Sequence, residues 1–505
     1  MNERPYDTAY AAGAVPAEKP KTVYSRAERI LAPVTMAAGF LFVRLALYHA
    51  AGVLTTLLFW GIITGSLMFL KKNGERFTAG QRLVIGVLYL FSVVYSITAD
   101  PLLHVLDTLF LLLTGALLLV SVTSGLHAVL RFLPGAAARG VFAMPLMHFP
   151  AQFASLGSGV KGRGILRNIG FVLAGLVLAV PVTGICAALL CASDANMDAA
   201  LGKLLSLPSD EVLVLIPHLA AGIVLGALLF SALYSAVHRS MILDEEESAG
   251  AVAGAGFLPP VMLLGATLPL CILYAVYIFT QMNYFLGGFF GELAAGYTYA
   301  EYARRGFFEL CAVCCINLCV LGGTQLFARQ KTLSLRIVSV YLGLCSLFQG
   351  GTAIAKMVMY VSAYGMTQLR VYTMWFMLLL MLLLLLVILR QFIRRLPIGA
   401  LSAAVFTVMF ALLCFSRPDA LMTRYNAERV LSGSLRAFDT SVLPGMSDDA
   451  WSVLCSYDPA QLTALSTMAY EDGEEGLGVQ LHDREDTLDL WESLNLSGLL
   501  LHLYA

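Results

Sequence analysis

The segment from Tyr297 to Cys319 joins two acids and two arginines to an apolar run that contains four cysteines, YTYAEYARRGFFELCAVCCINLC. On a helix, Cys311, Cys315 and Cys319 share one face and Cys314 lies beside them. Metal or redox chemistry needs thiolates, which burial in apolar surroundings disfavours. The segment also has no histidine to complete a zinc set. We therefore expect packing cysteines, with no metal and no cofactor.

The charges at the head of this segment have helical spacing. Glu301, Arg305 and Glu309 follow one another at i, i+4, so that Arg305 can bridge both acids, while Arg304 projects about a quarter turn away. Glu309 is expected about one turn below the outer membrane surface. A carboxylate at that depth must be paired, protonated or exposed to an aqueous cavity.

Charged residues on other predicted spans lie at a similar depth, in the outer half of the membrane. Together with the charges at the head of the cysteine segment, they make five cations and three anions. The paired N–H groups of an arginine side chain suit phosphate or carboxylate groups. One interpretation is a ligand-binding pocket for an anionic small molecule or lipid headgroup; the alternative is ion pairing and snorkelling at helix ends. The pocket hypothesis predicts that these residues surround one cavity. The eight are Arg44, Asp107, Glu301, Arg304, Arg305, Glu309, Lys356 and Arg370.

The elements that position these residues are predicted from composition. Of 505 residues, 59% are hydrophobic and 13% charged, which is typical of a membrane protein. Apolar runs of about 20 residues predict an all-α, polytopic transmembrane helical bundle of about eleven spans. They cover residues 30–48, 53–70, 82–98, 102–124, 168–191, 212–236, 258–282, 305–327, 337–362, 371–390 and 396–416.

Three regions follow from the charge pattern: a flexible cytoplasmic segment 1–29, the membrane domain 30–416 and a tail 417–505. The loops rich in Lys and Arg fall on the same side of the membrane as the N-terminus. We therefore expect a cytoplasmic N-terminus and an extracytoplasmic C-terminus. The tail holds 5 Lys/Arg and 15 Asp/Glu. Its apolar spacing predicts a small helical extramembrane region, with helix starts near Asp419, Asp448 and Pro459. The loop 126–167 is expected to begin with a partly amphipathic helix on the inner leaflet.

Several motifs together resemble a bacterial integral-membrane family known as domain of unknown function 4173, which is related to domain of unknown function 4153. They are YTYAEYARRGFFEL, AYGMTQLRVYT (363–373), GFLFVRLALY, DPLLHVLDTL and RPDALMTRYNAERVL. The resemblance covers most of residues 30–435. It implies a multi-pass protein of the bacterial plasma membrane and supplies no mechanism.

Two functions stay open. The first is a transporter or receptor-like protein that engages an anionic small molecule or lipid headgroup. The second is a non-catalytic signalling or assembly partner that docks a protein through its acidic tail or inner loop. No Ser-His-Asp order or HExxH motif predicts catalytic residues, so an enzyme is less favoured. No basic face is large enough to indicate nucleic-acid binding.

Overall fold

The computed structural model describes residues 24–48, 52–156, 211–239, 257–289, 307–330, 332–393, 395–438 and 445–467, and isolated residues elsewhere. Within these ranges ten helices are long and apolar enough to cross a membrane. They are α1 (Arg26–Phe42) with its π-helical continuation η1 (Val43–Tyr48), α2 (Gly52–Lys72), α3 (Ala79–Phe91) with α4 (Val94–Ile97), α5 (Pro101–Ser124), α12 (Glu211–Val237), α14 (Pro260–Phe289), α16 (Phe307–Phe327), α17 (Leu333–Tyr364), α18 (Gln368–Phe392) and α19 (Ile398–Phe415).

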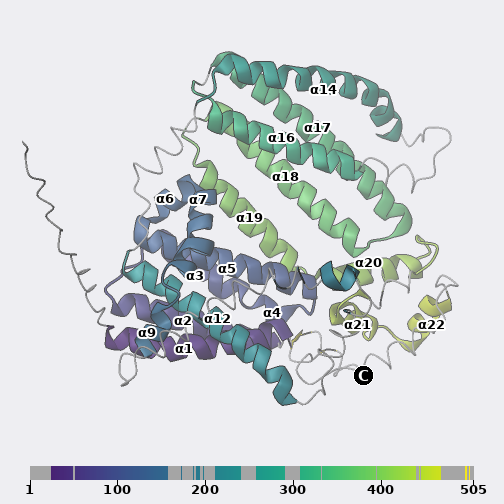
Figure 1. Cartoon of the computed structure of the whole chain (residues 1–505). Helices are drawn as coiled ribbons and strands as arrows, with labels where there is room; N and C mark the ends of the chain where they lie inside the picture. Colours follow the sequence, from purple (N-terminus) through teal and green to yellow (C-terminus); the bar gives the residue numbers. More distant parts are fainter. Residues whose placement is uncertain are drawn as a thin grey trace, which may run out of the picture.

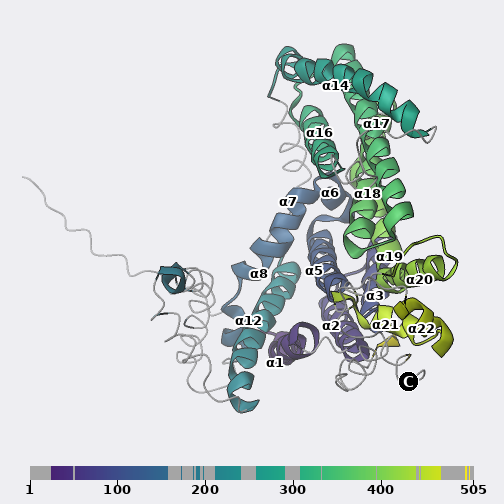
Figure 2. The same ribbon diagram turned by 90° about the vertical axis from the view of Figure 1, so that its right-hand side faces the viewer.

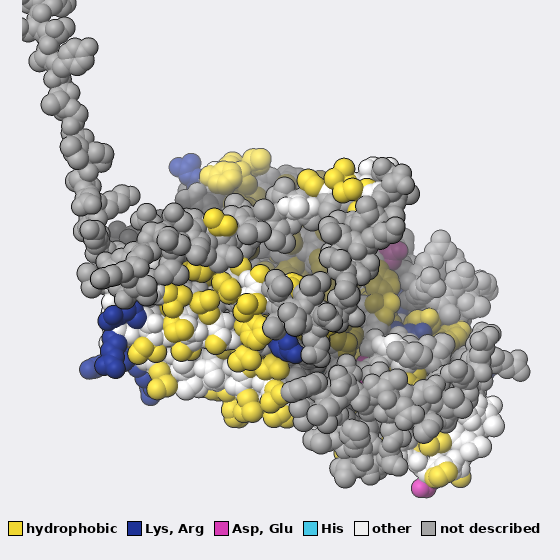
Figure 3. Space-filling view, turned by 60° about the horizontal axis from the view of Figure 1, so that its bottom comes forward, with side chains coloured by type: hydrophobic (Ala, Val, Ile, Leu, Met, Phe, Trp, Pro, Cys, Tyr) yellow, Lys and Arg dark blue, Asp and Glu magenta, His cyan; other side chains and the backbone are white. Residues whose placement is uncertain are grey.

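The predicted all-α polytopic bundle is confirmed. Ten of the predicted spans correspond to these ten helices, and the remaining one, 168–191, lies outside the described residues. Many large apolar side chains on the helices point outward, such as Leu109, which is 59% exposed, and Phe279, which is 79% exposed. Figure 3 shows one such hydrophobic face, with Lys and Arg side chains gathered at its left end. The chain is therefore a multi-pass membrane protein with a bilayer as its environment.

The helices α1 and α12 cross closely because glycines face each other at the contact. A Cβ atom on Gly39 would lie 2.2 Å from the Gly222 carbonyl oxygen, and one on Gly226 would lie 2.5 Å from the Thr35 carbonyl oxygen. Small residues of this kind let helix backbones approach and pack in lipid. Near the other end of the pair, His238, the residue after α12, contacts Glu28 on α1, with 2.8 Å between Nε2 and Oε1.

After α5 the chain forms five short helical pieces that pack on α1, α5 and α12 (Figure 2). They are α6 (Leu126–Arg131), α7 (Leu133–Ala138), η2 (Arg139–Ala143), α8 (Met144–Met147) and α9 (Ala151–Leu156). The hydroxyls of Ser231 and Ser235 on α12 both donate to the Met144 carbonyl, at 3.0 Å. The single partly amphipathic helix expected here is replaced by short pieces, with Pro134 and Pro145 in the first turns of α7 and α8, and side chains such as Ala136 and Met144 are buried. The placement of this segment on the inner leaflet stays a prediction.

The helices α14, α16, α17, α18 and α19 form a second layer of neighbours (Figure 1). The buried Asn317 joins three of them, because it accepts a hydrogen bond from the Tyr274 hydroxyl (2.7 Å) and donates one to Ser346 (2.8 Å). The helix α19 connects this layer to the helices that precede it in the chain, since the ring of Phe410 on α19 stacks on that of Phe91 on α3, with 5.6 Å between centroids. The helix α19 thus shares an apolar core with α2–α5, whereas α14, α16, α17 and α18 have an apolar core of their own.

The tail contains α20 (Pro418–Leu431), α21 (Asp448–Leu454) and α22 (Pro459–Thr467). These helices have an apolar core of their own, which includes Val430, Trp451 and Leu465. Their first residues confirm the helix starts predicted near Asp419, Asp448 and Pro459. The tail lies where α17 and α19 end and α5 and α18 begin, and we call this the tail end of the bundle.

Candidate functional site

A cavity of about 550 Å³ lies at the tail end, between the turn that joins α17 to α18 and the tail. Its volume is within the usual range for small-molecule sites. Its walls come from span ends, from α20 and from the segment after α20. The lining residues are Ser362, Ala363, Tyr364, Met366, Thr367, Arg370, Thr423, Asn426, Ser434, Leu435, Arg436, Ala437, Phe438, Leu443 and Met446.

The charge of this lining has one sign. Among the described residues, Arg370 and Arg436 are its charged lining residues, and none of the described lining residues is acidic. Hydroxyl and amide groups, such as those of Ser362, Thr367 and Asn426, supply further hydrogen-bonding capacity. Chemically, this lining suits a group that carries negative charge and several acceptor oxygens.

Arg370, in the first turn of α18, is held by neutral groups. Its Nη1 donates to the carbonyl oxygens of Tyr364 (3.2 Å) and Gly365 (2.5 Å), and the guanidinium lies 4.1 Å from the centroid of the Tyr360 ring. In the described part of the chain, no ion pair involves this arginine. Its position is therefore fixed by carbonyls and an aromatic ring that do not neutralise its charge.

The turn beside Arg370 is clamped to the tail by Asn426 on α20. The Asn426 side chain accepts a hydrogen bond from the Met366 backbone N–H (2.7 Å) and donates one to the Met366 carbonyl (2.8 Å). Gly365 has φ +76°, and a Cβ atom on it would lie 2.7 Å from Asn426 Oδ1. Glycine thus permits both the backbone conformation and the close approach. These contacts preform one wall of the cavity.

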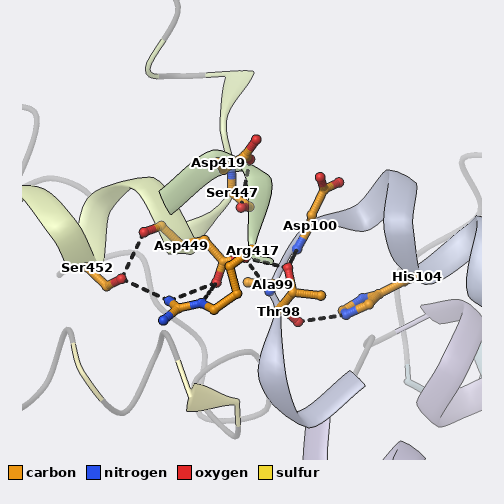
Figure 4. A network of polar contacts seen from close by, with 9 residues as sticks. All are labelled: Thr98, Ala99, Asp100, His104, Arg417, Asp419, Ser447, Asp449 and Ser452. Carbon is orange, nitrogen blue, oxygen red and sulfur yellow. Dashed lines mark hydrogen bonds and ion pairs between the residues drawn. The ribbon is translucent and has the colours of Figure 1, made fainter. Parts of the chain in front are cut away.

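Next to the cavity, a buried polar network holds the tail on the span ends (Figure 4). Arg417 Nη2 lies 3.1 Å from Oδ1 of Asp449, whose side chain is fully buried. The other carboxylate oxygen of Asp449 accepts hydrogen bonds from the Thr98 hydroxyl and from the Ala99 N–H (3.3 Å). Since Thr98 and Ala99 lie between α4 and α5, one tail carboxylate joins the tail to the membrane domain.

A second buried carboxylate, Asp419 on α20, reinforces this junction. It accepts hydrogen bonds from the N–H (2.9 Å) and hydroxyl (2.8 Å) of Ser447 and from Gln368 Nε2 on α18 (3.0 Å). Burial raises the pKa of the Asp419 carboxyl above its ordinary value. On α18, the Tyr372 hydroxyl donates a hydrogen bond to the carboxylate of Asp100, the residue that caps the N-terminus of α5. The helix that carries Arg370 is thus bonded to both sides of the junction.

The structure brings one of the eight predicted site residues, Arg370, to the cavity. Arg44 lies exposed on η1. Glu309 lies exposed on α16, within electrostatic range of Lys356 on α17. Asp107 is fully buried in α5. These four residues are absent from the cavity lining, and Glu301, Arg304 and Arg305 lie outside the described residues.

The cysteines of α16 differ in exposure. Cys314 is fully buried and its thiol donates to the Ser346 carbonyl, at 3.6 Å, whereas Cys319 is exposed. In the ranges that the structure covers, no three His, Cys, Asp or Glu side chains are grouped as metal ligands would be. The contacts of Cys314 agree with the packing role predicted for it.

Sequence reasoning did not identify Arg436, Asn426 or the Arg417–Asp449 pair. Arg417 and Asn426 lie in the motif RPDALMTRYNAERVL, which was used only as evidence of the family resemblance. Both Asp449 and Arg436 were counted as part of a net acidic tail. A residue-by-residue search for lone cations in that tail would have singled out Arg436.

Comparison with known proteins gives one family match. The family model described as "Domain of unknown function (DUF4153)" matches residues 85–457. The match includes the cavity and the tail helices α20 and α21. No curated protein and no solved structure matches the chain.

Proposed function

The chain belongs to the family described as a domain of unknown function (DUF4153), and from its cavity we propose that it is a receptor-like membrane protein that binds an anionic ligand. The proposal is carried by one observation: Arg370 and Arg436 line a cavity of about 550 Å³ in which none of the described lining residues is acidic. The ligand would be an anionic small molecule or a lipid headgroup, since phosphate and carboxylate are the groups that arginine binds through paired hydrogen bonds.

The position of the cavity favours binding over transport. It lies between span ends and the tail, so its occupant would touch the membrane domain and the tail together. Arg44 and Asp107, which a continuous outer-half site would include, are not among its lining residues. Uptake of a labelled ligand by proteoliposomes would instead support a transporter. A protein that co-purifies only while the tail is present would support the alternative role as a signalling or assembly partner.

We expect Arg370→Gln to weaken anion binding by on the order of tenfold, because a hydrogen bond to a charged group contributes about 1.5–3 kcal/mol. The measurement uses the purified full chain in nanodiscs. Calorimetry with inorganic phosphate in zwitterionic lipid detects a free anion. Native mass spectrometry after reconstitution with phosphatidylglycerol detects a retained headgroup.

Arg424→Gln is the matched control, because Arg424 is an exposed arginine on α20 that pairs with Glu428 and does not line the cavity. Arg436→Gln is a second cavity variant that should show the same loss as Arg370→Gln. If neither probe binds the wild type, or if all three variants bind equally, the proposal is wrong. Melting curves of each variant separate loss of binding from loss of folding.

We also propose that the membrane that holds this protein is the plasma membrane of a bacterium, with the N-terminus in the cytoplasm and the tail outside. In a Cys455→Ser background, Ser456→Cys on the tail is expected to react with a membrane-impermeant maleimide on intact cells. Asn73→Cys, on the turn between α2 and α3, should react only after permeabilisation. Both side chains are exposed, and the reverse pattern would contradict the orientation.

A further inference from the structure

Asp107, on α5 two turns from Asp100, is a buried carboxyl that has no hydrogen-bond partner among the residues that the structure describes. Its side chain is fully buried, and neither carboxylate oxygen has a hydrogen-bond partner within the part of the chain that the structure describes. Every other fully buried aspartate described above accepts at least two hydrogen bonds. An ionised carboxylate in such a place is costly, so the site favours the neutral acid.

His104 lies one turn away on the same face of α5, and it has a buried ring nitrogen that carries no hydrogen. Its Nε2 lies 2.8 Å from the Thr98 carbonyl oxygen, which can only accept, so Nε2 carries the hydrogen. The other ring nitrogen, Nδ1, is buried and has no hydrogen-bond partner among the described residues. The neutral acid and the unprotonated ring nitrogen lie one turn apart but are not hydrogen-bonded to each other, so a proton can pass directly between them only after a side-chain rotation brings the two groups into contact.

Among the residues that the structure describes, the groups around Asp107 offer it no countercharge. Tyr95 on α4 and Cys414 on α19 lie within electrostatic range of the carboxyl. The Tyr95 hydroxyl is already bonded to Thr108, and its ring stacks on His104 with 4.7 Å between centroids. The charged groups near this cluster are acids: Asp100 lies near Cys414, and Asp449, near His104, is paired with Arg417. From α18, Tyr372 is bonded to Asp100.

We propose that Asp107 and His104 form a proton-binding site at the tail end of the membrane domain. The ligand is a proton because a metal ion needs several converging oxygen, nitrogen or sulfur ligands, and the described side chains provide no such group here. Asp107 carries the proton, and His104 Nδ1 is the unprotonated base to which it can pass once a side-chain rotation brings the two groups into contact. The site is separate from the cavity, whose lining includes neither residue.

Infrared spectroscopy of the full chain in nanodiscs tests the proposal. The wild type at neutral pH is expected to show the carbonyl stretching band of a protonated carboxylic acid, and Asp107→Asn should lose it. Asp458→Asn, at an exposed carboxyl of the tail, is the control and should keep it. The band should decrease as the pH rises. His104→Gln keeps a donor for the Thr98 carbonyl, removes the ring nitrogen and should shift the midpoint of that decrease.

A second measurement does not depend on assigning a band. The melting temperature of the wild type should fall relative to that of Asp107→Asn as the pH rises, because only the wild type must then ionise a buried carboxyl. The proposal is wrong if Asp107→Asn leaves the band intact. It is equally wrong if the band stays constant over the whole pH range in which the protein is folded. An unchanged midpoint in His104→Gln removes His104 from the site. None of these results depends on whether the cavity binds an anion.

Discussion

Replacing Arg417 with alanine is expected to detach the tail from the membrane domain and to destabilise the junction by about 3 kcal/mol. The reason is that Asp449, fully buried, would lose the cation that pairs with it while it remains charged. We take the lower end of the range for a broken buried pair because 18% of the Arg417 side chain is exposed. Hydrogen exchange of α21, or limited proteolysis of the tail, would measure the loss.

Arg424→Ala is the matched control for this prediction. The Arg424–Glu428 pair is exposed on both sides, so its removal should cost less than about 1 kcal/mol. The double variant Arg417→Ala/Asp449→Asn should recover part of the lost stability, because the unpaired charge is removed with its partner. Equal protection of α21 in Arg417→Ala and Arg424→Ala would show that the ion pair does not hold the tail.

The second large effect is expected at the crossing of α1 and α12. Gly39→Ala adds one methyl group at a point where a Cβ atom would lie 2.2 Å from the Gly222 carbonyl oxygen. The obstacle is backbone, which cannot rotate away as a side chain can. The helices must separate, and we expect a loss of about 1–3 kcal/mol. Thermal unfolding in detergent, followed by circular dichroism, would measure it.

Gly115→Ala on α5 separates packing from helix propensity. Nothing lies within 4 Å of a Cβ atom built on Gly115. That change should be neutral or stabilise the helix by roughly 0.5–1 kcal/mol, because alanine loses less backbone entropy than glycine. Similar melting temperatures for Gly39→Ala and Gly115→Ala would mean that close approach does not stabilise this pair.

The spans could be predicted because run length and composition alone decide whether a segment can cross a bilayer. The ends of the helices and the breaks within them could not be predicted in this way. The predicted span 82–98 is divided into α3 and α4 at Ser92, whose hydroxyl bonds the Tyr89 carbonyl. Such local competition with the backbone ladder has no signature in hydropathy. The motif Gly222-x-x-x-Gly226 is typical of close helix contacts, but it does not identify the partner helix, and no contact was predicted from it.

The candidate site was predictable only in part. The depth of Arg370 was predicted from its position at the start of a span, and the idea of an anionic ligand came from the surplus of cations predicted in the outer half of the membrane. The rest depends on how the segment after α20 folds back over the turn at Gly365, and no periodicity links two segments about seventy residues apart. The burial of Asp107 depends on α4 and α19, whose packing the sequence does not specify.

The pairing of α1 with α12 has a consequence for the order of assembly during synthesis. The glycine of α1 meets its partners on a helix that the ribosome completes roughly 180 residues later, or about 10–40 s at ordinary elongation rates. Until then, α1 must wait in the membrane with its small-residue face uncovered. The short helices α8 and α9 must wait as well, since Ser231 and Ser235 belong to α12. The first half of the domain therefore cannot mature before the second half begins to enter the membrane.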